Sequence, residues 1–172
     1  MRTFRRRTPD QPPVPTRSAY VEALTMLARR ELSEAQIRQR LARKGHAPAD
    51  VDAAVERLRA ERAINDARVA EAIARTEVSV RRRGRLRVRR QIEQTGIAPA
   101  TARQALAAVF ADVDDDALLE TALDRRCRGQ AQPLDDAAVR RLYRYLVGQG
   151  FASDRVLSAL KRRRTTPARD DD

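Results

Sequence analysis

One pattern limits the fold of this chain more than any other feature, because it occurs three times, each time around a glycine. Gly45, Gly96 and Gly150 are spaced about 50 residues apart, a period typical of repeat architectures. Aliphatic residues stand four positions before each glycine and alanines nine positions after it: Leu41, Ile92, Leu146, Ala54, Ala105 and Ala159. The apolar residues on both sides follow helical spacing, so the pattern predicts a helix before and after every glycine.

Each of these glycines suits the end of a helix. A helix commonly closes through a residue in the left-handed conformation, which glycine adopts without a steric penalty from Cβ. Pro48 and Pro99 then suit the first turn of the next helix, where the missing N–H is not needed. A further amphipathic stretch lies upstream of each pair, and only 6 glycines in 172 residues disfavour a sheet protein. We therefore expect an all-α chain of nine helices in three triplets.

The repeats also set the expected domain boundaries. We predict a disordered basic arm, three three-helix repeats and a disordered acidic tail, which span residues 1–17, 18–65, 66–111, 112–164 and 165–172. The arm is rich in arginine and proline and cannot bury enough apolar surface to fold. A three-helix unit of this size is marginally stable alone, so we expect an elongated tandem array stabilised by neighbouring repeats or by a partner.

Several helix starts can be read from the sequence. Ser33, followed three residues later by Gln36, matches a capping box. Asp66 and Asp116 stand where the first helices of the second and third repeats should begin, and we expect them to be the N-caps of those helices.

Basic residues are concentrated at two places. The formal net charge is +12, from 36 lysines and arginines against 24 aspartates and glutamates. One cluster lies around Gly84 and the other on the last two helices: Arg81, Arg82, Arg83, Arg85, Arg87, Arg89 and Arg90, then Arg140, Arg141, Arg144, Lys161, Arg162 and Arg163. Cations at a helix C-terminus complement the helix dipole, which is an ordinary explanation for the terminal residues. The first cluster exceeds what a helix end can use and predicts salt-sensitive, sequence-independent nucleic-acid binding.

The sequence has few residues of the types that commonly catalyse reactions or bind metals. Cys127 and His46 are the single cysteine and histidine, so the usual four-ligand zinc site cannot form. We expect Cys127 to be a core residue and His46 to be exposed or capping in a turn. The aspartates from Asp112 to Asp116 precede an apolar-periodic segment, where acidic residues favour a helix start. We expect no catalytic residue, metal, cofactor or membrane span, and the lack of a secretory signal favours the cytoplasm.

Three groups of residues together give the chain a family resemblance. They are Ala19–Leu27 with Arg29, Arg30, Leu32 and Ser33; Ile64–Asp66 with Arg68, Val69 and Ala70; and Gly84, Arg87, Val88, Ile92, Gly96 and Ile97. In this combination, residues 19–163 resemble the RecX family, the regulators of the RecA recombinase.

The resemblance implies a helical array that lodges in the groove of the RecA nucleoprotein filament. Several weak contacts on one elongated array add through effective concentration, so we expect the chain to act as a monomer. The resemblance also implies inhibition or modulation of RecA ATP hydrolysis, strand exchange and SOS co-protease activity in recombinational DNA repair. Single-stranded and double-stranded DNA would be contacted without sequence specificity. The family has no catalytic residue to carry over.

A helix-turn-helix transcriptional regulator is the competing hypothesis, because a helix, a glycine turn and a second helix also describe that motif. Base reading requires Asn, Gln and Arg on one recognition helix, whereas the third helix of each repeat presents mainly alanine and valine. A basic RNA-associated protein is a third, weaker hypothesis.

Overall fold

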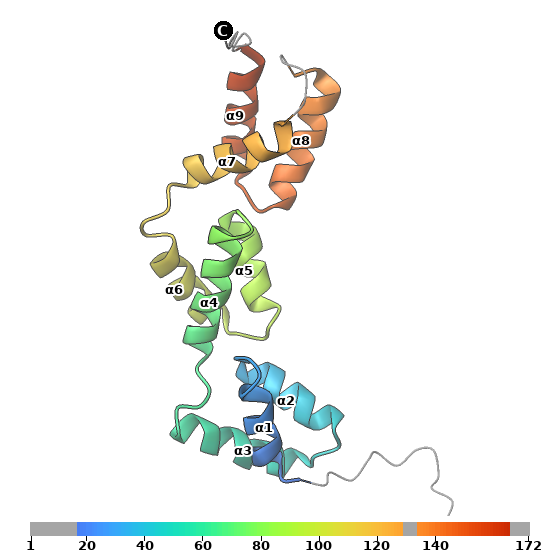
Figure 1. The fold of residues 1–172 in the computed structure, drawn as a ribbon, viewed down its shortest axis with the longest axis vertical. Coiled ribbons are helices and arrows are strands. Elements are labelled where there is room, and N and C mark those ends of the chain that lie inside the picture. The colour runs from blue at the N-terminus through green and yellow to red at the C-terminus, as the bar shows by residue number, and fades with distance from the viewer. Residues whose placement is uncertain (1–16, 129–133, 166–172) are drawn as a thin grey trace, which may run out of the picture. The chain divides into compact units, whose positions relative to one another are not determined.

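A computed structural model describes residues 17–128 and 134–165 of the chain, and these form helices and no strand (Figure 1). The helices are α1 (Ala19–Leu27), α2 (Glu34–Arg43), α3 (Pro48–Ala60), α4 (Asp66–Ser79), α5 (Arg85–Glu93), α6 (Pro99–Val109), α7 (Asp115–Cys127), α8 (Asp136–Gly148) and α9 (Ser153–Thr165). The all-α expectation is confirmed. Residues 1–16 of the predicted arm and 166–172 of the predicted tail lie outside the described residues.

The chain divides into two compact units, the first ending at Val69 and the second beginning at Ala70. In the first unit α1 and α2 pack against α3 around a core that includes Leu32, Ile37 and Leu58. In the second unit α5 packs against α6, and α8 packs against both α7 and α9. The boundaries of the three predicted repeats stay a prediction.

The three glycine turns adopt the predicted conformation. Gly45, Gly96 and Gly150 have φ angles of 86°, 81° and 91°, in the left-handed region. Pro48 and Pro99 are the first residues of α3 and α6, as expected. These helices have no side-chain N-cap, so the glycine turn and the proline that follows it define their starts.

Two of the three predicted N-caps are wrong. The capping box of Ser33 and Gln36 is present at α2. The side chain of Asn65, not Asp66, caps α4 by accepting from the Arg68 N–H at 3.0 Å. The carboxylate of Asp66 instead accepts from the backbone N–H of Glu34 at 2.9 Å, so it satisfies a free donor at the start of α2.

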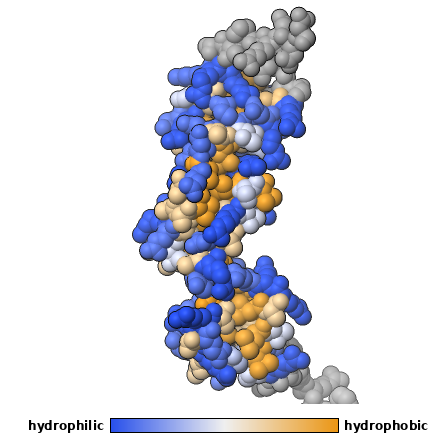
Figure 2. All heavy atoms as spheres, turned by 60° about the vertical axis from the view of Figure 1, so that its left-hand side comes forward, coloured by the Kyte–Doolittle hydropathy of each residue, from blue (hydrophilic) through white to orange (hydrophobic). Residues whose placement is uncertain are grey.

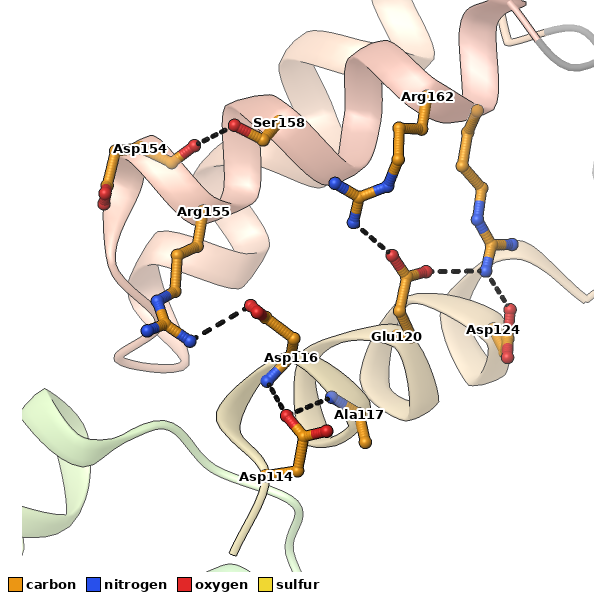
Figure 3. Close-up of polar contacts among 10 residues, drawn as sticks. Asp114, Asp116, Ala117, Glu120, Asp124, Asp154, Arg155, Ser158 and Arg162 are labelled. Atoms are coloured by element: carbon orange, nitrogen blue, oxygen red, sulfur yellow. Dashed lines mark hydrogen bonds and ion pairs between the residues drawn. The ribbon is translucent and has the colours of Figure 1, made fainter.

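The start of α7 is the second correction. Asp114 is its N-cap and accepts from the N–H groups of Asp116 and Ala117 (Figure 3). Asp116 lies inside the first turn. In a run of aspartates each residue can cap, and sequence spacing alone does not select which one does.

His46 is buried, which contradicts the expectation of an exposed or capping residue. Only 8% of the residue is accessible, and its Nε2 atom lies 2.9 Å from a carboxylate oxygen of Glu22 on α1. Lys44 donates to the other oxygen of Glu22 at 3.2 Å. The hydrogen bond from His46 is the main cause that lowers the pKa of Glu22 below its ordinary value of 4.5, with a further contribution from Lys44.

This contact predicts a pH-dependent contribution to the stability of the first unit. Because the pKa of Glu22 is lower in the folded chain, its stabilising effect is present above pH 4.5 and is lost as the pH falls below that value. We expect Glu22→Gln to reduce the free energy of unfolding at neutral pH and to have progressively less effect in acid. Urea unfolding of both chains across the acid range measures this difference.

Glu56→Gln is the matched control, because Glu56 is exposed and its one ion pair with a described residue is to Arg59 on its own helix. Its effect should be within about 0.5 kcal/mol of zero at neutral pH. An equal effect of the two substitutions at neutral pH would contradict the role assigned to Glu22.

Backbone contacts hold the start of α5 against the turn between α8 and α9. The N–H of Gly84 donates to the carbonyl of Gln149 at 3.0 Å, and the N–H of Leu86 donates to the carbonyl of Gly150 at 3.1 Å. A Cβ atom on Gly84 would lie 2.4 Å from the Gly150 oxygen, and one on Gly150 would lie 2.2 Å from the Arg87 nitrogen. Both positions therefore need glycine, and the contact fixes α4 and α5 relative to α8.

The surface of both units mixes hydrophilic side chains with small apolar patches (Figure 2). Among the described residues, Val80, which directly follows α4, is the most exposed of the large apolar side chains, at 68%. In the described part of the chain, no helix has both the length and the apolar character needed to cross a membrane.

Candidate nucleic-acid interface

The turn after α4 is organised by one buried carboxylate. Glu77 is 4% accessible and forms ion pairs with Arg81 at 2.8 Å and with Arg83 at 2.5 Å. Between these two arginines, Arg82 adopts a left-handed φ of 53°. Its exposed guanidinium has neither an ion pair nor a hydrogen bond with any described residue. Glu77 thus fixes the turn and leaves Arg82 available for a partner.

This turn forms one wall of an open pocket of about 610 Å³, which we call the interhelical arginine pocket. The end of α4 and its turn, α7 and α8 line it: Val80, Arg81, Arg82, Arg83, Ala122, Arg125, Arg126, Tyr145 and Gln149. None of these described lining residues is acidic, so the arginines give the pocket a strong positive potential.

An aromatic ring lies beside the charges. Tyr145 on α8 is 40% accessible, and the guanidinium carbon of Arg126 lies 5.4 Å from its ring centroid. Guanidinium groups bind phosphate oxygens in a bidentate manner, and an exposed ring can stack on a nucleic-acid base. The chemistry of the pocket fits a phosphate chain that carries bases, and sequence readout would require side chains aimed at base edges.

Comparison with known proteins identifies the family. Models described as the first and second three-helix domains of RecX match residues 19–58 and 65–106. The regulatory protein RecX of Halorhodospira halophila is 34% identical over 138 residues, which are 80% of this chain and 83% of that protein. The chain belongs to the RecX family. The RecX protein of Syntrophotalea carbinolica is 33% identical, and the match covers 81% of this chain and 92% of that protein.

Solved RecX structures share the fold. The crystal structure of RecX from Lactobacillus salivarius has a TM-score of 0.70 and 17% identity, over 84% of this chain and 93% of that one. A second crystal structure, of a regulatory protein RecX, has a TM-score of 0.67 and 21% identity, over 84% of this chain and 70% of that one. The resemblance inferred from the sequence is confirmed, and the chain is a member of a family of regulatory proteins.

The structure of this RecX family member separates the first arginine cluster into two groups. Arg81, Arg82 and Arg83 line the interhelical arginine pocket. Arg85 pairs with Asp115 at 2.8 Å and lies over the Phe110 ring.

Three arginines of the same cluster remain. Arg87 donates to the carbonyl of Gly148 at 2.9 Å, and Arg89 lies 3.6 Å from Glu93. Arg90 is exposed, and its guanidinium has no ion pair or hydrogen bond with a described residue. Several charges that the sequence groups together therefore support the fold rather than face a common surface.

The second cluster is divided in a similar way. Arg162 and Arg163 pair with Glu120 on α7 at 2.8 and 3.0 Å, and Arg163 also pairs with Asp124 (Figure 3). These pairs join α9 to α7. Lys161 is exposed on α9. The other predicted site residues, Arg140, Arg141 and Arg144, are exposed on α8, and their guanidinium groups form no contact with a described acidic residue.

Sequence reasoning missed Arg125 and Arg126, which complete the pocket from α7. A usable signal was present, because both follow Leu123 in the last turn of a helix whose buried face includes Leu119 and Leu123. The expectation for Cys127 is confirmed, since it is buried at 7% accessibility and burial raises the pKa of its thiol. A raised pKa disfavours the reactive thiolate.

Proposed function

We propose that this RecX family member binds the RecA nucleoprotein filament and inhibits or modulates RecA ATP hydrolysis, strand exchange and SOS co-protease activity. The observation that carries the proposal is the interhelical arginine pocket, which has arginines from both the turn after α4 and α7 and no acidic residue among its described lining. A filament presents a continuous row of DNA phosphates beside RecA protein, and a pocket of this charge is attracted to that row.

The pocket residues have different roles in this proposal. Arg82 and Arg125 contact phosphates, because both are exposed and have no acidic partner among the described residues. Tyr145 stacks on a base without selecting its identity. Arg81 and Arg83 are held by Glu77 and keep the turn in position. Contact with the filament restrains RecA by obstructing extension of the filament or exchange of strands in its groove.

The test compares two variants that lose the same charge. Arg82→Gln with Arg125→Gln removes two pocket charges, whereas Arg62→Gln with Arg103→Gln removes two exposed charges outside that pocket. We expect the purified wild-type chain to inhibit ATP hydrolysis and strand exchange by RecA on single-stranded DNA. The pocket variant should require roughly tenfold more protein for the same inhibition, and the slope of log affinity against log salt should fall by about 1.4.

The control variant should inhibit RecA as the wild-type chain does. Equal inhibition by the pocket variant and the control would contradict the assignment of the pocket. A discrete protected sequence in a footprint of bare duplex DNA, without any effect on RecA, would instead support the helix-turn-helix regulator.

A further inference from the structure

A second basic pocket lies in the first unit, apart from the two basic clusters identified in the sequence, and it includes Arg17 at the end of the predicted basic arm. It has a volume of about 740 Å³, and we call it the first-unit basic pocket. The residue Arg17 before α1, α1 itself, the turn that follows it and the end of α2 line it: Arg17, Glu22, Thr25, Met26, Arg29, Arg30, Arg40, Arg43 and Lys44. The backbone N–H groups of Arg29 and Arg30 both donate to the carbonyl of Met26, which places this turn at the pocket wall.

Ion pairing separates the arginines that line the pocket from most of the other arginines of the first unit. Four arginines outside the pocket form ion pairs with carboxylates at 2.9 Å or less: Arg38, Arg57, Arg59 and Arg68. Those that line the pocket form no ion pair with a described residue: Arg17, Arg29, Arg30, Arg40 and Arg43. Five unpaired guanidinium groups therefore line this one pocket, whereas outside it Arg62 is the only described arginine of the first unit without an ion pair.

The one acidic residue in the pocket does not neutralise these arginines. Glu22 is already engaged by His46 and Lys44 at 2.9 and 3.2 Å. The helix dipole of α2 accounts for Arg40 and Arg43 in its last turn. It does not account for Arg29 and Arg30, which follow α1 and approach the same pocket from another segment. The positive charge of the first-unit basic pocket therefore suits the binding of a polyanion.

We propose that the first-unit basic pocket binds the phosphate backbone of nucleic acid, as a contact separate from the interhelical arginine pocket. Duplex DNA carries one negative charge per roughly 1.7 Å of its axis, so several phosphates reach one such pocket together. The described lining has neither Asn nor Gln to pair with a base edge. We expect its arginines to contact phosphates, so binding should be independent of sequence.

The experiment measures binding of the full-length chain to a fluorescein-labelled oligothymidylate across a salt series, without RecA. Arg29→Gln with Arg43→Gln removes two charges from the first-unit basic pocket, and Arg62→Gln with Arg103→Gln is the control of equal charge. We expect the first variant to bind roughly tenfold more weakly at low salt, with a salt slope lower by about 1.4. The control should bind about as the wild-type chain does.

Two results would overturn the proposal. One is an affinity and salt slope of the Arg29 and Arg43 variant that equal those of the control. The other is competition by poly-glutamate that matches competition by unlabelled oligothymidylate at the same charge concentration, because this would assign the pocket to an acidic protein.

This test is independent of RecA. If the Arg82 and Arg125 variant fails to alter RecA inhibition but the Arg29 and Arg43 variant binds DNA weakly, the proposed function fails and the first-unit basic pocket stands. When all four substitutions are combined, the loss in salt slope should be the sum of the two separate losses, since the pockets lie on different units.

Discussion

Gly150→Ala should reduce the free energy of unfolding of the second unit by about 2–5 kcal/mol. Two effects add at this position. The φ angle of 91° is unfavourable for any residue with a Cβ atom, and that atom would lie 2.2 Å from the backbone nitrogen of Arg87. No side-chain rotation can relieve a clash with backbone, so α5 would have to move and break the hydrogen bond between Leu86 and Gly150.

Gly84→Ala isolates one of these effects. Its φ angle is −76°, which alanine adopts readily, so the substitution adds only the close approach of 2.4 Å to the Gly150 oxygen. We expect a loss of about 1–3 kcal/mol. Urea unfolding followed by circular dichroism measures both variants, and binding to oligothymidylate should weaken in both because the interhelical arginine pocket depends on this contact.

Gly148→Ala is the matched control. Gly148 is the last residue of α8, and a Cβ atom there would meet nothing within 4 Å. Alanine at this site should be neutral or stabilising by up to about 1 kcal/mol. If Gly150→Ala and Gly84→Ala were as stable as Gly148→Ala, the backbone contact between α5 and the turn after α8 would be contradicted.

Glu77→Ala should reduce the free energy of unfolding by about 2–4 kcal/mol. The carboxylate of Glu77 is buried and binds two guanidinium groups, one of which, on Arg83, is itself 17% accessible. Removing the carboxylate leaves Arg83 without its partner and releases the turn in which Arg82 takes a left-handed conformation. Glu77→Gln keeps a hydrogen-bond acceptor without the charge and should give a smaller loss.

Glu71→Ala controls for the loss of a helical ion pair in the same element. Glu71 and Arg75 are paired at 2.6 Å on α4, and the Arg75 side chain is 67% accessible. Such a pair contributes about 0.3–0.5 kcal/mol. Similar urea midpoints for Glu77→Ala and Glu71→Ala would show that Glu77 does not organise the turn.

The fold could be predicted from the sequence because its signals are local. A glycine that ends a helix and a proline that starts the next lie within a few residues of each other, as Gly45 with Pro48 and Gly96 with Pro99 show. The choice of Asp114 over Asp116 as N-cap was not predictable in the same way, since both carry the same side chain within one turn.

The candidate site was less predictable because its charges depend on distant partners. Arg85 appears as part of a basic run until the fold brings Asp115 to it, and Arg162 appears free until α7 supplies Glu120. Arg125 lies far from the run around Arg82, yet both line one pocket. Counting charges along a sequence identifies a basic protein but does not show which charges the protein itself neutralises.

The contact between α5 and the turn after α8 has a consequence for how such proteins can diversify. It is made by main-chain N–H and C=O groups, which every residue except proline possesses, around Gly84 and Gly150. This contact therefore requires a particular residue type, glycine, only at positions 84 and 150. Substitutions elsewhere on these helices can change which ligand the surface binds without breaking the backbone contact.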